Sequence, residues 1–203
     1  MTKKYTLKED FSMVAMLTIP IAVAINVVGD QIVQLLKLPI FCDTIGTILM
    51  GMLAGPWAAA VTGILSNLVM GITDNPTLIP FAITNATVGI VAGFMARKDW
   101  FCTQKWKYAV IVLALTIATI CTASPITIFF FGGVSGNGGQ SVAIASLMAA
   151  GTNIVTAVIG TDFWVNILDK IVSLIIIVGI LQVIPDRTKI KYSLGEKYAK
   201  YAK

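Results

Sequence analysis

The sequence predicts an all-α membrane protein: a six-transmembrane-helix bundle with cytoplasmic N- and C-termini, plus a re-entrant or surface helix near residues 142–159. The composition is the first reason, because 57% of the 203 residues are hydrophobic and only 12% are charged. Soluble domains are about 45–50% apolar and about 25% charged. Long apolar segments recur along the chain, and the mean hydropathy is +0.85. Six spans of about 20 residues would fill most of residues 1–203, so we expect a single membrane-embedded domain.

Breaks in the apolar pattern set the limits of the predicted spans. Pro39 precedes the second span, and Gly55-Pro56 separates the second from the third, because proline does not continue a helix. A polar turn, 73–76, ends the third span, and a basic, aromatic stretch, 97–107, follows the fourth. The six predicted spans are about 11–36, 40–54, 57–72, 78–95, 108–131 and 163–184.

Basic residues predict the orientation of these spans. Thirteen of the 15 Lys and Arg residues precede the first span, follow the last, or lie between the fourth and fifth. Positive loops face the cytoplasm, and the three regions share one side only if Val142–Ile159 does not cross the membrane. That segment is therefore expected to be re-entrant, to lie on the membrane surface, or to extend the last helix. The glycine-rich loop before it, 132–139, suits a mobile gate over an outer cavity.

Several kinds of chemistry are excluded by missing residue types. The chain has no histidine, which excludes serine–histidine catalysis and histidine-ligated zinc sites. It has no G-x-x-x-x-G-K-[ST] phosphate loop for ATP hydrolysis. The acid–base candidates, Asp43, Asp162 and Asp169, have no motif spacing. We therefore expect no enzyme activity, no metal, no cofactor and no nucleic-acid polymer as partner.

Polar side chains gather toward the outer ends of the predicted spans. Inside a membrane such groups tend to face a cavity or one another, so we predict a small-molecule site open to the outside. The candidate substrate-binding residues are Asn26, Asp30, Asp43, Asn67, Asn85, Asn153, Trp164, Asn166, Asp169 and Lys170.

Structural roles compete with ligand binding at several of these positions. Asp43, Asp74 and Asp162 are also candidate helix caps or loop residues, and the deeper asparagines could join helices. Trp164 could anchor the chain at the membrane interface. Asp169 and Lys170 are adjacent and point to different faces of a helix, so we expect each to pair with something else. Lys170 could also extend toward the interface.

One stretch carries a family resemblance. The run DTIGTILMGMLAGPWAAAVTGILSNLVMG, Asp43 to Gly71, resembles the second and third helices of the substrate-binding (S) components of energy-coupling factor (ECF) transporters. The Ala-Gly-Pro turn between two helices rich in small residues is its specific part. The runs FFFGGVSGNGG and LDKIVSLII, followed by a proline and a basic tail, also resemble that family.

The resemblance implies a function in uptake. It implies a multi-pass protein of the bacterial plasma membrane that captures a vitamin-like molecule on the outer side. It also implies two kinds of partner, a membrane coupling subunit and two cytoplasmic ATPase subunits. Members carry a small-residue face for docking to the coupling subunit, and the first helix here departs from the usual pattern. The candidate docking residues are Ala15, Ala22, Gly51, Gly55, Ala59 and Gly63, although these residues could equally pack the bundle itself.

The residues narrow the expected substrate. The absence of histidine and the scarcity of outer cations argue against a strongly anionic ligand. A pyridoxine-like, hydroxymethylpyrimidine-like or nucleoside-like heterocycle suits the amides and carboxylates. The alternative function is a self-contained secondary carrier for a small polar solute, which would usually show inverted repeats. A membrane enzyme or an assembly protein are further alternatives.

Overall fold

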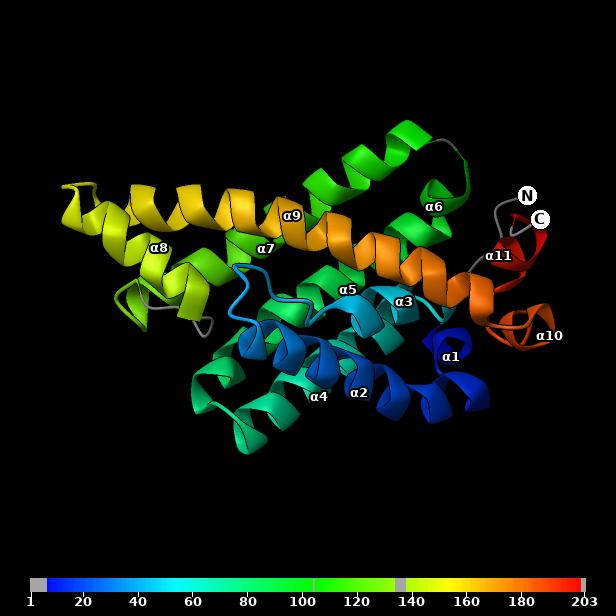
Figure 1. The fold of residues 1–203 in the computed structure, drawn as a ribbon. Coiled ribbons are helices and arrows are strands. Elements are labelled where there is room, and N and C mark those ends of the chain that lie inside the picture. The colour runs from blue at the N-terminus through cyan, green and yellow to red at the C-terminus, as the bar shows by residue number, and fades with distance from the viewer. Residues whose placement is uncertain (1–6, 104, 134–137, 202–203) are drawn as a thin grey trace.

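Helices make up all the regular structure in the part of the chain that the computed structural model describes, residues 7–103, 105–133 and 138–201 (Figure 1). The elements are α1 (Leu7–Asp10), α2 (Met13–Leu35), α3 (Ile45–Leu53), α4 (Pro56–Thr73), η1 (Pro76–Phe81), α5 (Ala82–Arg97), α6 (Trp100–Thr103), α7 (Lys105–Phe129), α8 (Gly138–Ala149), α9 (Ile154–Val183), α10 (Asp186–Lys189) and α11 (Glu196–Tyr201). Residues 134–137 of the glycine-rich loop, on which the expected gate depends, lie outside the described residues.

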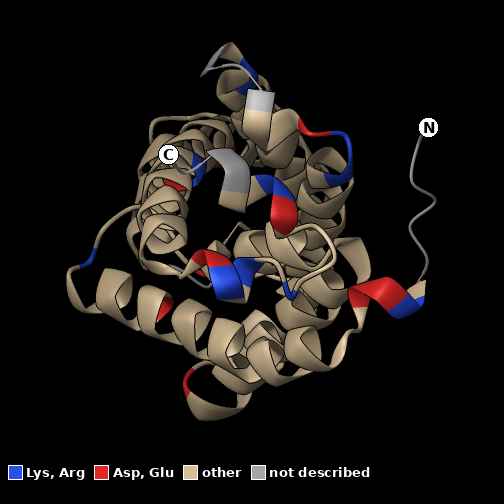
Figure 2. Ribbon diagram, turned by 90° about the vertical axis from the view of Figure 1, so that its right-hand side faces the viewer, with Lys and Arg blue, Asp and Glu red and all other residues tan. Residues whose placement is uncertain are grey.

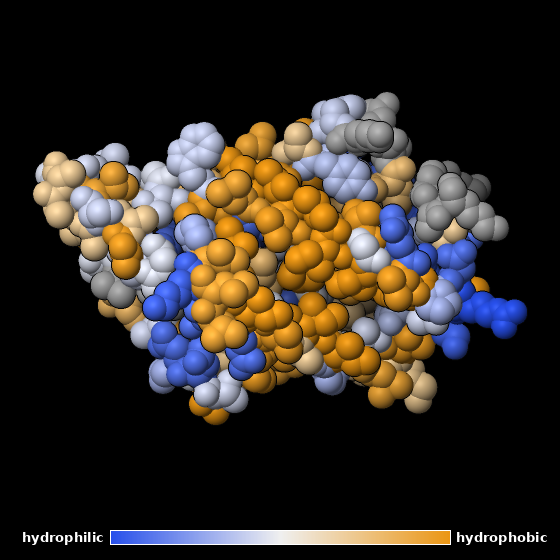
Figure 3. Space-filling view, viewed as in Figure 1, coloured by the Kyte–Doolittle hydropathy of each residue, from blue (hydrophilic) through white to orange (hydrophobic). Residues whose placement is uncertain are grey.

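Five helical stretches among the described residues are long and apolar enough to cross a membrane. They are Met13–Leu35, Pro56–Thr73, Pro76–Arg97, Trp106–Phe129 and Ile154–Val183. Large apolar side chains on their surfaces are exposed, among them Leu17, Ile117 and Ile175. On the face shown in Figure 3, apolar residues form a belt across the middle of the molecule, with hydrophilic residues toward both ends. A lipid environment accommodates such a belt, so the fold is that of a membrane-embedded helical protein.

The second predicted span, 40–54, differs most from the expectation. Only Ile45–Leu53 is helical there, and nine residues rise about 14 Å, roughly half the thickness of the hydrocarbon core. Residues 36–44 lead into α3 as a loop, with left-handed backbone at Lys37 (φ 53°) and Cys42 (φ 53°). All nine residues of α3 are buried. Irregular backbone is tolerated at this depth because neighbouring helices supply its hydrogen bonds.

The doubtful segment 142–159 divides between two helices. Its first part belongs to α8, and its last six residues form the start of α9, after a turn at Gly151 (φ 88°). The Asn153 side chain caps α9 by accepting a hydrogen bond from Val155 N at 2.9 Å. Ile144 of α8 packs in a small cluster with two residues of α9, Ala157 and Val158. The helix of the last predicted span, 163–184, thus begins about two and a half turns earlier than expected, and α8 folds back against it.

Both ends of the described chain lie at one end of the bundle (Figure 1). Asp10 of α1 forms an ion pair with Arg97 at 2.7 Å and accepts a hydrogen bond from Trp57 N at 3.2 Å. In the tail, Lys197 pairs with Asp99 and donates to the Arg97 carbonyl. Figure 2 looks onto this end and shows charged segments of several helices there. Burial raises the pKa of Asp10, and the hydrogen bond from Arg97 only partly opposes it.

The small residues of α3, α4 and α5 pack these helices closely against one another. A Cβ on Gly51 would lie 3.0 Å from Gly93 N, and one on Gly63 would lie 2.7 Å from the backbone carbonyl of Asn85. All six candidate docking residues, Ala15, Ala22, Gly51, Gly55, Ala59 and Gly63, are buried within the chain. The structure therefore uses them for internal packing and offers none of them to a partner surface.

Candidate functional site

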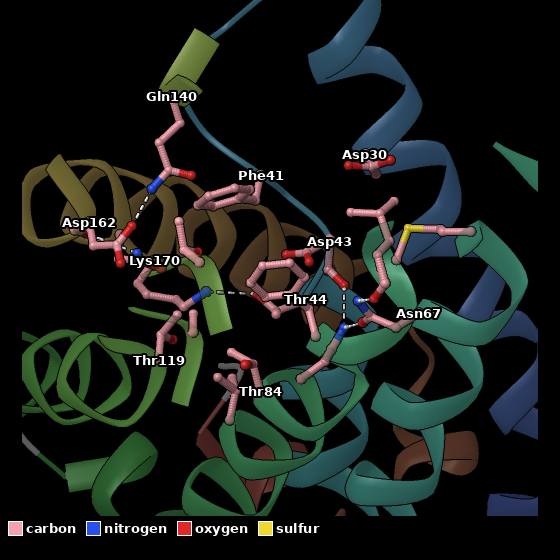
Figure 4. A pocket seen from close by; sticks show the side chains of 18 residues that line it. Asp30, Phe41, Asp43, Thr44, Asn67, Thr84, Thr119, Gln140, Asp162 and Lys170 are labelled. Atoms are coloured by element: carbon pink, nitrogen blue, oxygen red, sulfur yellow. Dashed lines mark hydrogen bonds between the residues drawn. The ribbon is translucent and has the colours of Figure 1, made fainter. Parts of the chain in front are cut away.

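A polar cavity lies in the half of the bundle remote from the two termini. It offers about 60 Å³ to the centres of water-sized molecules, several times the roughly 10–15 Å³ that one water needs. Six α-helices, η1 and the loop before α3 contribute side chains that line this space (Figure 4).

Six of the ten predicted substrate-binding residues meet in this cavity. They come from α2, the loop before α3, α4, α5 and α9, and are Asp30, Asp43, Asn67, Asn85, Asn166 and Lys170. Helical spacing places Asn166 and Lys170 on one face of α9, because residues four apart lie above each other.

Two asparagines connect four segments beside the cavity, namely α4, α5, η1 and the loop before α3. Asn85 Nδ2 donates to Asn67 Oδ1 at 2.9 Å and to the Asp43 carbonyl at 3.1 Å. Asn67 Nδ2 donates in turn to the Leu78 carbonyl at 3.0 Å. These bonds join α4 and α5 to the loop before α3, so the asparagines hold helices together and line the cavity at once.

Lys170 pairs with its neighbour, contrary to the prediction. Its Nζ donates to Asp169 Oδ2 at 2.7 Å and to Thr44 Oγ1 at 3.0 Å. The prediction was wrong because the four-carbon lysine stem can fold back along the helix to reach an adjacent carboxylate. Lys170 is also 1% exposed, so it does not extend toward the interface. Asp169 Oδ1 accepts from the backbone N–H groups of Phe41 and Cys42 at 3.1 Å and 2.7 Å.

Asp162 is a cavity residue that the sequence analysis did not assign to the site. Its carboxylate is 2% exposed and accepts hydrogen bonds from Ser124 of α7 and Gln140 of α8. From the sequence it is as much a candidate helix cap or loop residue as a ligand contact, because aspartates near the membrane interface often cap helices. The only sequence signal was its distance of four residues from Asn166 and eight from Lys170, which places all three on one helical face.

The aromatic lining also differs from the prediction. Trp164 is 68% exposed and packs edge-on against Phe163, with ring centroids 5.6 Å apart. Phe41 and Phe81 line the cavity instead, and Phe81 stacks on Phe131 at 5.9 Å. Both phenylalanines lie inside predicted spans, 40–54 and 78–95, where an apolar residue carries no distinguishing signal.

The remaining candidates lie outside the cavity lining. Asn26 is fully engaged: its Nδ2 donates to Thr47 and Ser66 at 2.8 Å each, and its Oδ1 accepts from Gly46 N at 2.6 Å. Asn153 is exposed at the start of α9, where it is a cap. Asn26 therefore joins α2, α3 and α4, the structural role weighed for it from the sequence.

Three buried polar atoms of the lining have no hydrogen-bond partner among the described residues. They are Thr84 Oγ1, Asn85 Oδ1 and Asn166 Oδ1, on side chains that are 7%, 2% and 1% exposed. A buried polar atom without a partner costs about 1–3 kcal/mol. A solute or an ordered water in the cavity could supply the hydrogen bonds that these atoms lack.

Fold and site together define the class: a membrane-embedded helical protein with an internal polar cavity between its helices. Comparisons with protein-family models, curated proteins and solved structures found no match for this chain.

Proposed function

We propose that this protein is the substrate-capture subunit of an ATP-driven importer of the ECF type. It binds a vitamin-like small heterocycle, of pyridoxine, hydroxymethylpyrimidine or nucleoside type, at the outer side of a bacterial plasma membrane. It delivers this solute together with a membrane coupling subunit and two cytoplasmic ATPases. The cavity carries the proposal, because it combines partnerless polar atoms with two phenylalanines inside an apolar bundle.

The chemistry of the lining supports a small, partly aromatic solute. Phe41 and Phe81 offer faces on which a planar ring can stack, and the amides and carboxylates offer directional hydrogen bonds. Ligand sites of this kind are mostly apolar, with a few placed polar groups that give specificity.

The proposed topology has six crossings with both termini in the cytoplasm. Asp10, Arg97 and Lys197 meet at one end of the bundle, which supports an even number of passes between them. The second pass would consist of the loop 36–44 and the short α3. The basic regions gather at this end, and positive charge favours the cytoplasm. The cavity would then lie in the outer half.

The proposal of partner subunits rests on the sequence resemblance of Asp43 to Gly71. The small-residue candidates for docking are buried inside the chain, so a coupling subunit would contact other residues of the bundle. An S component would need such partners because the sequence carries no phosphate-binding loop of its own.

Purification and transport assays test the proposal together. The tagged chain, isolated from its native membrane in mild detergent, is expected to bring down one membrane subunit and two ATPases. Uptake of the bound solute is expected to stop when the ATPases are inactivated. Solute uptake into liposomes by the chain alone, without ATP, would instead establish the self-contained secondary carrier. Conversion of the solute by the purified chain would establish a membrane enzyme.

A further inference from the structure

Two of the three partnerless atoms in the cavity lining are amide oxygens, and the third, the Thr84 hydroxyl, can accept as well as donate. Asn85 uses its amide nitrogen twice, toward Asn67 Oδ1 and the Asp43 carbonyl. Asn166 uses its amide nitrogen toward the Asp162 carbonyl at 2.8 Å. A backbone carbonyl only accepts, so these bonds assign nitrogen and oxygen in both amides. What remains partnerless is Oδ1 of each, and an amide oxygen can only accept.

The charged groups in the cavity lining are also mostly hydrogen-bond acceptors. Asp30, Asp43 and Asp162 contribute carboxyl groups, and Lys170 is the one cation among the described residues around the cavity. The Lys170 ammonium is already bonded to the Asp169 carboxylate. The bonds to Asp30 and Asp162 that the structure shows come from neutral groups, the amides of Gln34 and Gln140 and the hydroxyl of Ser124. Buried carboxylates held only by neutral donors favour a cation in the same low-dielectric space.

From these two observations we infer that the solute is a donor-rich organic molecule: a small ring carrying an amino or ammonium group that faces Asp162 and Asn166. The inference rests on the proposed capture function and names the substrate class for it. Hydroxyl groups can donate to the same oxygens but bring no charge. An anionic group, such as a phosphate ester, would be repelled by the carboxylates and would leave the amide oxygens without a donor.

The arrangement of Asp162 and Asn166 suits such a group. They are one turn apart on α9, and Asn166 Nδ2 is tied to the Asp162 carbonyl. The Asp162 carboxylate is positioned from two sides by Ser124 and Gln140. A charged donor gains most from an oxygen that is already oriented and dehydrated, because hydrogen bonds with an ionised partner are the stronger kind.

Two pairs of compounds test the inference on the unmodified protein. Pyridoxamine and pyridoxine differ by an ammonium in place of a hydroxyl, and cytidine and uridine differ by an amino group in place of a carbonyl. Equilibrium binding to the detergent-purified chain is expected to favour the amino member of at least one pair by about tenfold or more. Equal binding within both pairs, or tighter binding of pyridoxine or uridine, would overturn the inference while leaving solute capture intact.

A matched pair of variants tests whether the preference for amino compounds depends on the Asp162 carboxylate. Asp162→Asn keeps the side-chain shape, and it is expected to abolish the preference for the amino compound. Asp186→Asn removes an exposed carboxylate at the opposite end of the bundle and is expected to leave the preference unchanged. A preference that survives in Asp162→Asn overturns the assignment to this carboxylate. If that variant does not fold, the comparison of the four compounds on the wild type still decides the substrate class.

Two remaining outcomes are also decisive. Inorganic cations could satisfy the same oxygens, so the binding assays are repeated in sodium, potassium and choline salts. Stabilisation by sodium or potassium alone, with no preference for amino compounds, overturns an organic ligand. If none of the four compounds binds and mass spectrometry finds no co-purified solute, the capture function itself fails, and the inference fails with it.

Discussion

Lys170 Nζ lies 2.7 Å from the carboxylate of Asp169, the residue before it, and both side chains are at most 1% exposed. The pair does more than neutralise two charges. Asp169 also accepts hydrogen bonds from two backbone N–H groups of the loop before α3, and Lys170 also donates one to Thr44. The last long helix therefore holds the loop that leads into the short α3.

Removal of Asp169 is expected to destabilise the protein more than removal of Lys170. Asp169→Ala leaves a buried ammonium and two backbone N–H groups without their acceptor, and breaking a buried pair costs about 3–5 kcal/mol. Lys170→Met leaves a carboxylate that still accepts two backbone bonds. Thermal unfolding of both variants in the same detergent measures the difference. The reverse order of stability would contradict the proposed anchoring role of Asp169.

Thr84 offers a test that separates binding from folding. Its hydroxyl is buried without a partner among the described residues, so Thr84→Val is expected to leave the ligand-free protein equally stable or more stable. Ligand affinity is expected to fall by about three- to tenfold. Thr87→Val on the same helix is the control, because the Thr87 hydroxyl bonds only to the Ile83 carbonyl at 2.8 Å. A loss of stability without a loss of affinity would argue against ligand contact by Thr84.

Glycines at the contact of α4 and α5 are expected to resist substitution. A Cβ on Gly93 would lie 2.8 Å from the Gly55 carbonyl carbon and closer still to Pro56, so Gly93→Ala should cost about 1–3 kcal/mol. Gly179 of α9 has open space around it, and Gly179→Ala is expected to stabilise the helix by about 0.5–1 kcal/mol. Unfolding temperatures of the two variants report both effects. Equal responses would show that close packing does not limit position 93.

The raised pKa of Asp10, at the end of the bundle where the termini lie, predicts that the stability of the protein depends on pH. Burial raises its pKa from the ordinary value of 3.8, so the folded state binds this proton more readily than the unfolded chain does. Its contribution to stability is therefore present at low pH and is lost as the pH rises through the folded pKa. Lowering the pH from 7 toward 4 should raise the unfolding temperature of the wild type relative to Asp10→Asn. A wild-type advantage that grows with rising pH would show that the ion pair with Arg97 outweighs burial.

Cysteine labelling tests the proposed topology. In a background without Cys42, Cys102 and Cys121, Thr73→Cys marks the end of α4 and Lys191→Cys marks the tail. Both positions are exposed. An impermeant maleimide should label residue 73 in intact cells and residue 191 only after permeabilisation. Labelling of the tail from outside intact cells would exclude a cytoplasmic C-terminus.

Most of the helical architecture could be predicted because apolar length is a local property. The limits of α2, α4 and α5 fall close to those expected, and Gly55-Pro56 separates α3 from α4 as the proline predicted. The predicted bounds of α3 and α9 were wrong because contacts between residues distant in sequence override the local apolar pattern there. The helix α3 is short because Asp169 and Asn26 supply hydrogen bonds to its entry, and α9 extends back to Asn153 because α8 packs beside it.

Composition was enough to predict a helical, membrane-embedded chain, because so apolar a sequence leaves too little polar surface for water. The sequence also predicted a set of polar residues at a common depth. Which of these residues meet depends on the folding of the chain, because their hydrogen bonds join residues up to 128 positions apart. In the folded chain Asn26 therefore joins three helices by hydrogen bonds, Asp162 lines the cavity, and the adjacent Asp169 and Lys170 form an ion pair.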